Sequence, residues 1–123
     1  MQNDKAKFKK EFKERLYGFV LRVLKFTRTV PKNEISNVII NQLIRSVTSI
    51  LANYIEARAS SPKREFTNFF QHSLKSANES IIWLNLLKDT DNGDKEEIDY
   101  LLKELDEIAK IFGSSIISLK GKN

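Results

Sequence analysis

The sequence predicts an all-α protein, an antiparallel up-down four-helix bundle that forms a single domain over residues 1–123. Apolar residues recur at steps of three and four along four segments, which is the period of a helix, and no strand pattern rivals them. Turn-forming segments separate these helices, and the short connections predict that successive helices are antiparallel neighbours. Hydrophobic residues make up 41% of the chain and charged residues 30%, a balance typical of a globular domain.

The first two helices are predicted over residues 4–28 and 34–58. Pro31 separates them, because proline lacks a backbone donor and biases Val30 toward an extended conformation. Asn33 is a suitable N-cap for the second helix. The apolar stripe of the first helix comprises Phe8, Phe12, Leu16, Phe19, Val23 and Phe26. That of the second comprises Ile35, Ile39, Leu43, Ile50 and Tyr54.

The third and fourth helices are predicted over residues 62–88 and 94–118. Ser61 is the expected cap of the third helix, and Pro62 suits its first position, where no donor is needed. The segment 89–93 has turn chemistry, and Asp94 with Glu97 has the spacing of a capping box. The apolar stripes are Phe66, Phe69, Phe70, Leu74, Ala77, Ile81, Leu84 and Leu87, then Ile98, Leu101, Leu102, Leu105, Ile108, Ala109, Phe112 and Ile116.

Two helices are more apolar than one core requires. Between residues 16 and 26, apolar side chains cover more than half of the circumference of the first helix. The second helix carries an additional apolar stripe, Ile40, Ile44, Val47, Leu51 and Ile55. Surplus apolar faces of this kind are expected to pack against another subunit, so the sequence predicts a homo-oligomer. The alternative is a thicker core with scattered exposed residues.

The sequence holds few of the residues that catalysis needs. It has no cysteine, and His72 is its single histidine. Bundles that bind two metal ions use Glu-x-x-His motifs, but Phe69 stands three residues before His72. The glycines stand alone and form no phosphate-binding loop. We therefore expect no enzymatic activity, no cofactor, no metal and no small-molecule substrate. We also expect no membrane-spanning helix and a cytoplasmic location.

A polar stripe runs along the second helix, whose other faces are largely apolar. It comprises Gln42, Arg45, Ser46, Ser49, Asn53 and Glu56. Buried polar groups require partners, and the third helix offers Glu79 about one turn from the level of Arg45. We predict that Arg45, Asn53, Glu56 and Glu79 are at least partly buried and hydrogen-bonded to one another. A solvated face and a ligand-binding stripe are the two alternatives.

The first quarter of the chain is basic. Residues 1–32 hold ten Lys or Arg and three Asp or Glu, a net charge of +7, whereas the remainder carries −2. Lys5, Lys9 and Lys13 are spaced four apart, and Arg22 is expected to continue their ridge roughly. This surface is a candidate site for RNA or DNA, without base stacking, because Phe8 and Phe12 are assigned to the core. The alternative is that acidic residues of the fourth helix neutralise it.

The polar stripe also carries a family resemblance. The run QLIRSVTSILANYIEA, residues 42–57, resembles the signature of the intervening-sequence proteins, which are encoded in insertions of bacterial large-subunit ribosomal RNA genes. The same family is labelled S23 ribosomal protein. Residues 65–66 and 79–84 match its pattern in the third helix, but Ser76 stands where the family usually has a glutamate. The departure puts in doubt any ion pair made at that position.

The resemblance covers nearly the whole chain and implies a four-helix bundle that assembles into a ring-like homopentamer. The family is similar to the accessory protein of diversity-generating retroelements, a basic pentamer that binds nucleic acid and a reverse transcriptase. No enzymatic activity is associated with the family. The expected function is therefore that of an oligomeric binding protein for RNA or a nucleic-acid-handling partner. The alternative is a protein–protein scaffold that binds no nucleic acid.

Overall fold

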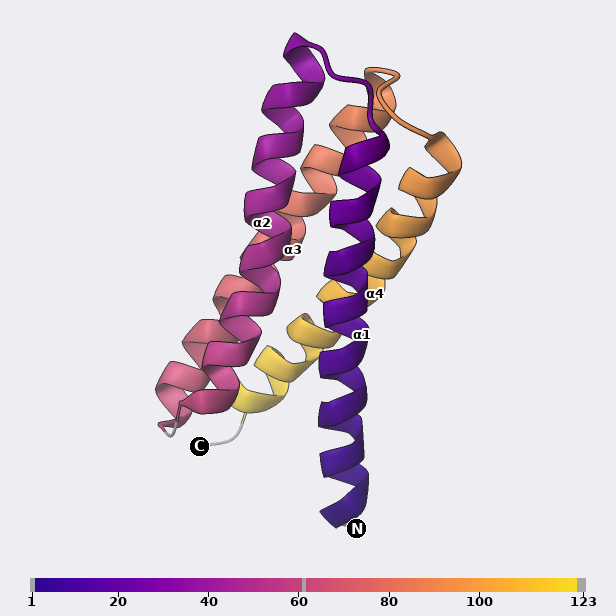
Figure 1. Cartoon of the computed structure of the whole chain (residues 1–123). Helices are drawn as coiled ribbons and strands as arrows, with labels where there is room; N and C mark the ends of the chain where they lie inside the picture. Colours follow the sequence, from indigo (N-terminus) through magenta and orange to yellow (C-terminus); the bar gives the residue numbers. More distant parts are fainter. Residues whose placement is uncertain (1, 61, 122–123) are drawn as a thin grey trace.

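The computed structural model describes residues 2–60 and 62–121, which form four long helices (Figure 1). Helix α1 spans Gln2–Thr29, α2 Glu34–Ala59, α3 Lys63–Asp89 and α4 Lys95–Lys120. Successive helices run in opposite directions, and the described residues contain no strand. The predicted up-down helical bundle is confirmed, and each predicted boundary lies within two residues of the observed one.

The helix caps follow the sequence in one case and depart from it in another. Asn33 caps α2 as predicted: its Oδ1 accepts a hydrogen bond from the Ser36 amide at 2.8 Å, and Ser36 Oγ accepts one from the Asn33 amide at 3.0 Å. The predicted capping box at Asp94 is wrong, because the Asp94 side chain makes no cap hydrogen bond. Glu97 instead pairs with Arg22, a charge-assisted contact stronger than a cap. The predicted cap Ser61 lies outside the described residues, and Pro62 occupies the N-cap position of α3.

An aromatic cluster closes the core near the hairpin that joins α2 to α3. Each helix contributes one buried ring, namely Phe12, Tyr54, Phe70 and Phe112. Phe112 makes edge-on contacts with the other three, at ring-centroid distances of 5.5 Å to Phe12, 6.1 Å to Tyr54 and 5.2 Å to Phe70. Such pairs each contribute roughly 0.5–1.5 kcal/mol beyond the area that they bury. The cluster therefore ties all four helices together at this end.

At the opposite end, the two connecting loops are joined by a pair of asparagines. Asn33 donates a hydrogen bond from its side-chain amide to Asn92 Oδ1 at 2.8 Å, and Asn92 is buried. Gly93 follows with φ of 100°, a conformation that L-residues with a side chain rarely adopt. A Cβ built on Gly93 would lie 3.0 Å from the Phe26 ring, so the glycine also allows the loop to approach α1.

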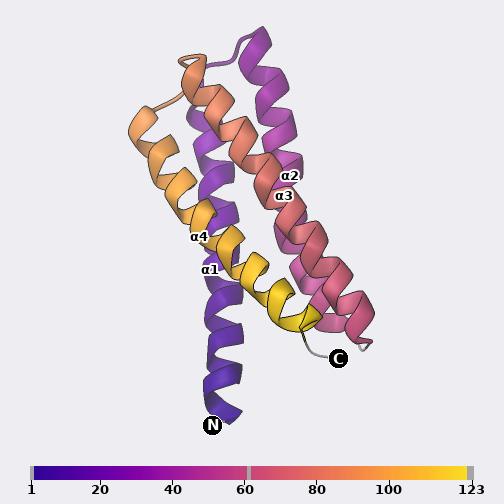
Figure 2. The ribbon, with the colours of Figure 1, turned by 180° about the vertical axis from the view of Figure 1, so that it is seen from behind.

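The four helices are not packed equally. The contact between α2 and α3 is the most extensive, and α1 makes the slightest contacts with its neighbours. Both views show the N-terminal turns of α1 extending beyond the end of the other helices (Figures 1 and 2). By length and composition, α2 is apolar enough to cross a membrane, a test that core helices of globular proteins also pass. Its buried residues pack into the core of the bundle.

The predicted apolar stripes form the core, with two exceptions. Phe8 is 54% exposed in the N-terminal part of α1, and Ile35 is 56% exposed at the first turn of α2. The surplus apolar residues are divided. Val47 is fully buried and Ile40 and Leu51 are half-buried, whereas Tyr17, Leu21 and Ile55 are exposed. The first two helices therefore leave several large apolar side chains exposed to solvent.

Candidate functional site

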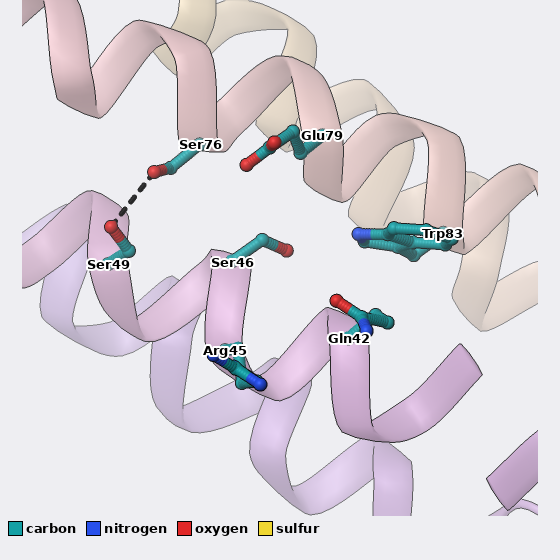
Figure 3. A pocket seen from close by; sticks show the side chains of 7 residues that line it. All are labelled: Gln42, Arg45, Ser46, Ser49, Ser76, Glu79 and Trp83. Carbon is teal, nitrogen blue, oxygen red and sulfur yellow. Dashed lines mark hydrogen bonds between the residues drawn. The ribbon is translucent and has the colours of Figure 1, made fainter. Parts of the chain in front are cut away.

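A polar groove lies between α2 and α3 at the predicted polar stripe. Its volume is about 380 Å³, and its lining residues are Gln42, Arg45, Ser46, Ser49, Ser76, Glu79 and Trp83. Figure 3 shows Glu79 and Trp83 projecting from α3 toward Ser46 and Gln42 of α2. The groove thus combines four residues of α2 with three of α3, and most of them belong to the two runs that carry the family resemblance.

Five serines line the contact beneath the groove, and we call them the serine ladder: Ser46, Ser49, Ser73, Ser76 and Ser80. Ser46 Oγ and Ser80 Oγ are 2.7 Å apart, Ser76 Oγ donates to Ser49 Oγ at 2.9 Å, and Ser73 Oγ donates to the Ile50 carbonyl oxygen at 3.0 Å. A hydroxyl on a single carbon reaches the main chain of the other helix only when the two backbones lie close together. The ladder therefore allows the tight packing of α2 on α3.

The predicted burial of the charged stripe residues is wrong for the single subunit. Arg45, Glu56 and Glu79 are exposed, and no ion pair joins them among the described residues. Arg45 points away from Glu79 (Figure 3). The reason is geometric: Arg45 and Ser46 are adjacent, so they lie about 100° apart around the helix and cannot both face α3. Gln42 is exposed as well.

Asn53 fulfils the prediction in part, although its partner is Ser49 of the same helix and not a charged residue. Both are half-buried, and the Asn53 side-chain amide donates to the Ser49 carbonyl oxygen at 2.9 Å and to Ser49 Oγ at 3.0 Å. The groups of α3 that bond to this stripe are serine hydroxyls, and not the charged and amide side chains that we expected there. The available signal was the spacing of Ser73, Ser76 and Ser80, which matches that of Ser46, Ser49 and Asn53 on α2.

The polar side chains that line the groove are hydrogen-bond donors and acceptors. Its buried serine hydroxyls are hydrogen-bonded to each other and to main-chain oxygens, not to a base. His72 is exposed and does not line the groove. Within the described part of the chain, no three His, Cys, Asp or Glu side chains are placed to hold a metal ion. Arg45, Glu79, Gln42 and Trp83 can offer both donors and an acceptor to a polar partner.

The four residues predicted to bind nucleic acid do not form one surface. Lys5, Lys9 and Lys13 are exposed, form no ion pair among the described residues, and are called the lysine ridge below. Arg22 does not continue this ridge, because nine residues turn a helix by two and a half turns and place Arg22 opposite Lys13. Phe8, which we expected in the core, is largely exposed, and in the sequence it lies between Lys5 and Lys13.

Two arginines of α1 are instead bound by acidic residues of α4. Arg15 Nε and Nη2 donate to Glu104 at 2.7 and 2.8 Å, and Nη2 also donates to Glu107 at 2.7 Å. Arg22 makes a two-fold contact with Glu97 at 2.8 and 2.9 Å, and its guanidinium lies 3.7 Å from the centre of the Tyr100 ring. The hydrogen bonds from the arginines lower the pKa of Glu104 and of Glu97.

This contact confirms that α1 and α4 are neighbours, as expected, and that α4 neutralises part of the basic helix. Among the described residues, the ion pairs between α1 and α4 involve only these two arginines of α1. Lys5 and Lys9 line a separate pocket at the end of the bundle where α1 begins and α4 ends. Two lysines of the ridge therefore lie at this end of the bundle, whereas Lys25 and Arg28 are exposed toward the other end of α1.

A family model described as 23S rRNA-intervening sequence protein matches residues 9–114. Among solved structures, the bundle is similar to a protein of unknown function from the S23 ribosomal protein family of Bacteroides thetaiotaomicron. The two chains share 30% sequence identity with a TM-score of 0.79, and the match covers 85% of this chain and 97% of the other. No curated protein matches significantly. The family match spans most of the chain, including both groove-forming helices, so the chain belongs to the 23S rRNA-intervening sequence protein family.

Proposed function

We propose that this protein is a non-enzymatic, homo-oligomeric helical-bundle protein that binds RNA or DNA through the lysine ridge. The observation that carries the proposal is the division of positive charge on α1. Arg15 and Arg22 are held by α4, whereas Lys5, Lys9 and Lys13 are exposed and form no ion pair among the described residues. Exposed lysines can release counterions from phosphates, so binding should be non-specific and should weaken steeply as salt is added.

Self-association would bring several lysine ridges together and so strengthen the positive field that a single subunit offers. The exposed apolar residues Tyr17, Leu21 and Ile55 on α1 and α2 support an interface between subunits. In a ring, each subunit would repeat the lysine ridge, and the summed field would attract a polyanion. The family resemblance makes five subunits the expected number.

A charge-reversal variant tests nucleic-acid binding. Lys5, Lys9 and Lys13 are changed together to Glu, and binding of a labelled RNA and a labelled DNA duplex is followed by fluorescence anisotropy at low salt. The control variant changes Lys95, Lys103 and Lys110 of α4 to Glu, which alters the net charge equally at other exposed positions. We expect the first variant to lose binding and the control to retain most of it.

A specific observation favours the second candidate, a protein–protein scaffold without nucleic-acid binding: α4 already neutralises the two arginines nearest the middle of α1. If wild-type protein does not bind either nucleic acid, or if both variants bind equally well, the scaffold function is the better one.

Assembly is tested separately by light scattering. We expect Ile55→Asp to shift the protein toward monomers, because it places a charge within the apolar surface of α1 and α2. Ile117→Asp is the matched control, since Ile117 is 76% exposed on α4. A monomeric wild-type protein at micromolar concentration would contradict the oligomeric part of the proposal.

A further inference from the structure

A second pocket lies at the end of the bundle where α1 begins, α2 ends, α3 begins and α4 ends. Its volume is about 460 Å³, within the range of ligand sites. Three of its lining residues are cationic, Lys5, Lys9 and Arg58, and three carry hydroxyls, Ser114, Ser115 and Ser118. No carboxylate lines it. The other lining residues, Phe66, Phe70 and Leu119, are apolar. The polar part of the lining thus consists of donors suited to an anion, and it differs from that of the polar groove, which includes Glu79.

Arg58 is held in place by aromatic rings and not by an acid. Its guanidinium lies 5.1 Å from the ring centres of Tyr54 and Phe66 and 5.7 Å from that of Phe70. Its Nε donates to the Tyr54 hydroxyl at 3.2 Å. No ion pair to Arg58 occurs among the described residues. The two terminal nitrogens therefore keep their donors, and a planar guanidinium fixed in this way suits a phosphate group.

The hydroxyls of the three serines have no hydrogen-bond partner among the described residues. Hydroxyls within helices often donate to the carbonyl oxygen four residues earlier, as Thr48 and Thr67 do here. Ser114, Ser115 and Ser118 make no side-chain hydrogen bond within the described part of the chain, although all three line the same pocket. Their donors are available to a ligand.

The backbone does not oppose an anion at this position. Two helix N-termini, those of α1 and α3, and two C-termini, those of α2 and α4, lie at this end of the bundle. Their partial charges are of opposite sign and cancel to first order. The charge of the pocket is therefore set by its side chains, and these are positive.

We infer that this pocket binds one phosphate group of a nucleotide, held by Arg58, Lys5 and Lys9 and by the hydroxyls of Ser115 and Ser118. The inference rests on the proposed nucleic-acid binding and deepens it, because it assigns a defined phosphate subsite that shares Lys5 and Lys9 with the lysine ridge. The phosphate belongs either to a nucleic-acid backbone or to a free nucleotide, and the experiment below distinguishes these sources.

The test uses two variants with matched controls. Arg58→Gln removes one charge from the pocket, and Arg28→Gln removes the same charge from the opposite end of α1, where Arg28 is exposed. Ser118→Glu adds a carboxylate to the pocket, and Asn85→Glu adds one at an exposed position of α3. Binding of a labelled oligouridine RNA is measured by anisotropy at low salt. We expect Arg58→Gln to weaken binding about tenfold, Ser118→Glu to weaken it similarly, and the controls to change it little.

The sources are separated by titrating ¹⁵N-labelled protein with uridine 5′-monophosphate and with uridine. We expect the phosphate form, but not uridine, to shift the amide signals of residues 114–118. Melting followed by circular dichroism verifies that each variant is folded. Ser118→Glu keeps the proposal testable if loss of Arg58 from its rings unfolds the protein.

Each outcome decides between the hypotheses. If the pocket variants bind RNA as tightly as their controls do, the phosphate pocket is wrong and the lysine ridge alone accounts for binding. If wild-type protein binds no RNA but the monophosphate shifts residues 114–118, nucleic-acid binding is wrong and the pocket is a site for free nucleotides. If it binds neither, both proposals are wrong.

Discussion

The contact between α2 and α3 and the contact between α1 and α4 are built from different chemistry. Short neutral side chains of the serine ladder bring α2 and α3 together, and their hydroxyls bond at 2.7 to 3.0 Å. Long charged side chains join α1 to α4, through Arg15 with Glu104 and Arg22 with Glu97. Small residues permit close backbones, whereas an arginine–glutamate pair spans a wider separation near the surface.

The difference has an energetic consequence. Buried serines such as Ser73 and Ser80 are fully enclosed, so altering them affects packing as well as hydrogen bonds. Exposed ion pairs contribute little, about 0–1 kcal/mol each, and salt screens them. We therefore expect the pair formed by α2 and α3, which make the most extensive contact, to open less readily than α1, which makes the slightest contacts.

The largest expected effect is in hydrogen exchange. The amides of residues 4–11 lie on turns of α1 that extend beyond the bundle, whereas those of residues 73–80 lie against α2. We expect residues 4–11 to exchange roughly a hundredfold faster or more, because local opening there breaks few contacts. Equal protection in the two segments, measured by mass spectrometry, would contradict the comparison.

The next effect is on stability. Ser80→Leu inserts a larger side chain at a fully buried position and removes the bond to Ser46. We expect the free energy of unfolding to fall by roughly 1–3 kcal/mol or more, because α2 and α3 have no room to separate without disturbing the core. Denaturant melts measure the change, and Asn78→Leu, at an exposed position of α3, is the control. Similar melts for the two variants would show that the ladder is not closely packed.

A smaller effect is expected at the contact of α1 with α4. Arg15→Gln should lower the free energy of unfolding by about 0.5–1 kcal/mol at neutral pH, since the lost contact is partly exposed. Hydrogen bonds from Arg15 lower the pKa of Glu104 below its ordinary 4.5. The stabilisation is therefore complete above pH 4.5 and is lost as the pH falls through the lower folded-state pKa.

Urea melts of wild type and Arg15→Gln at several pH values measure this dependence. The difference between the two proteins should shrink in acid and at high salt. A difference that stays constant in acid would indicate that the Arg15 stem contributes through packing and not through charge.

The smallest effect is expected for Glu79→Gln. Glu79 is exposed and makes no ion pair among the described residues. The free energy of unfolding of the isolated subunit should therefore change by about 0.5 kcal/mol or less, and its melting temperature should change little. The measurement should be made at several protein concentrations. A clear, concentration-dependent loss of stability would show that the polar groove is an interface between subunits.

The site was less predictable than the fold. Asn53 and Ser49 of the polar stripe are half-buried, but Arg45, Glu56 and Glu79 are exposed, contrary to the prediction. The polar stripe of α2 is about 100° wide, so it meets the neighbouring helix along one edge only. Which edge that is depends on the position of α3, which the sequence of α2 does not contain. The second pocket was missed altogether, since Arg58, Lys9 and Ser118 come from three helices.

The sequence by itself determined the four helices, the cap at Asn33, most of the core and the family. These follow from local signals: an apolar period, a turn and a short motif are each contained within one segment. Only the tertiary structure decided which cations remain available, because Arg22 meets Glu97 of α4, whereas Lys13 is exposed and forms no ion pair among the described residues. It also decided that Glu97 pairs with Arg22 and does not complete a capping box at the start of α4. The energetically better partner of a side chain can lie on a distant segment.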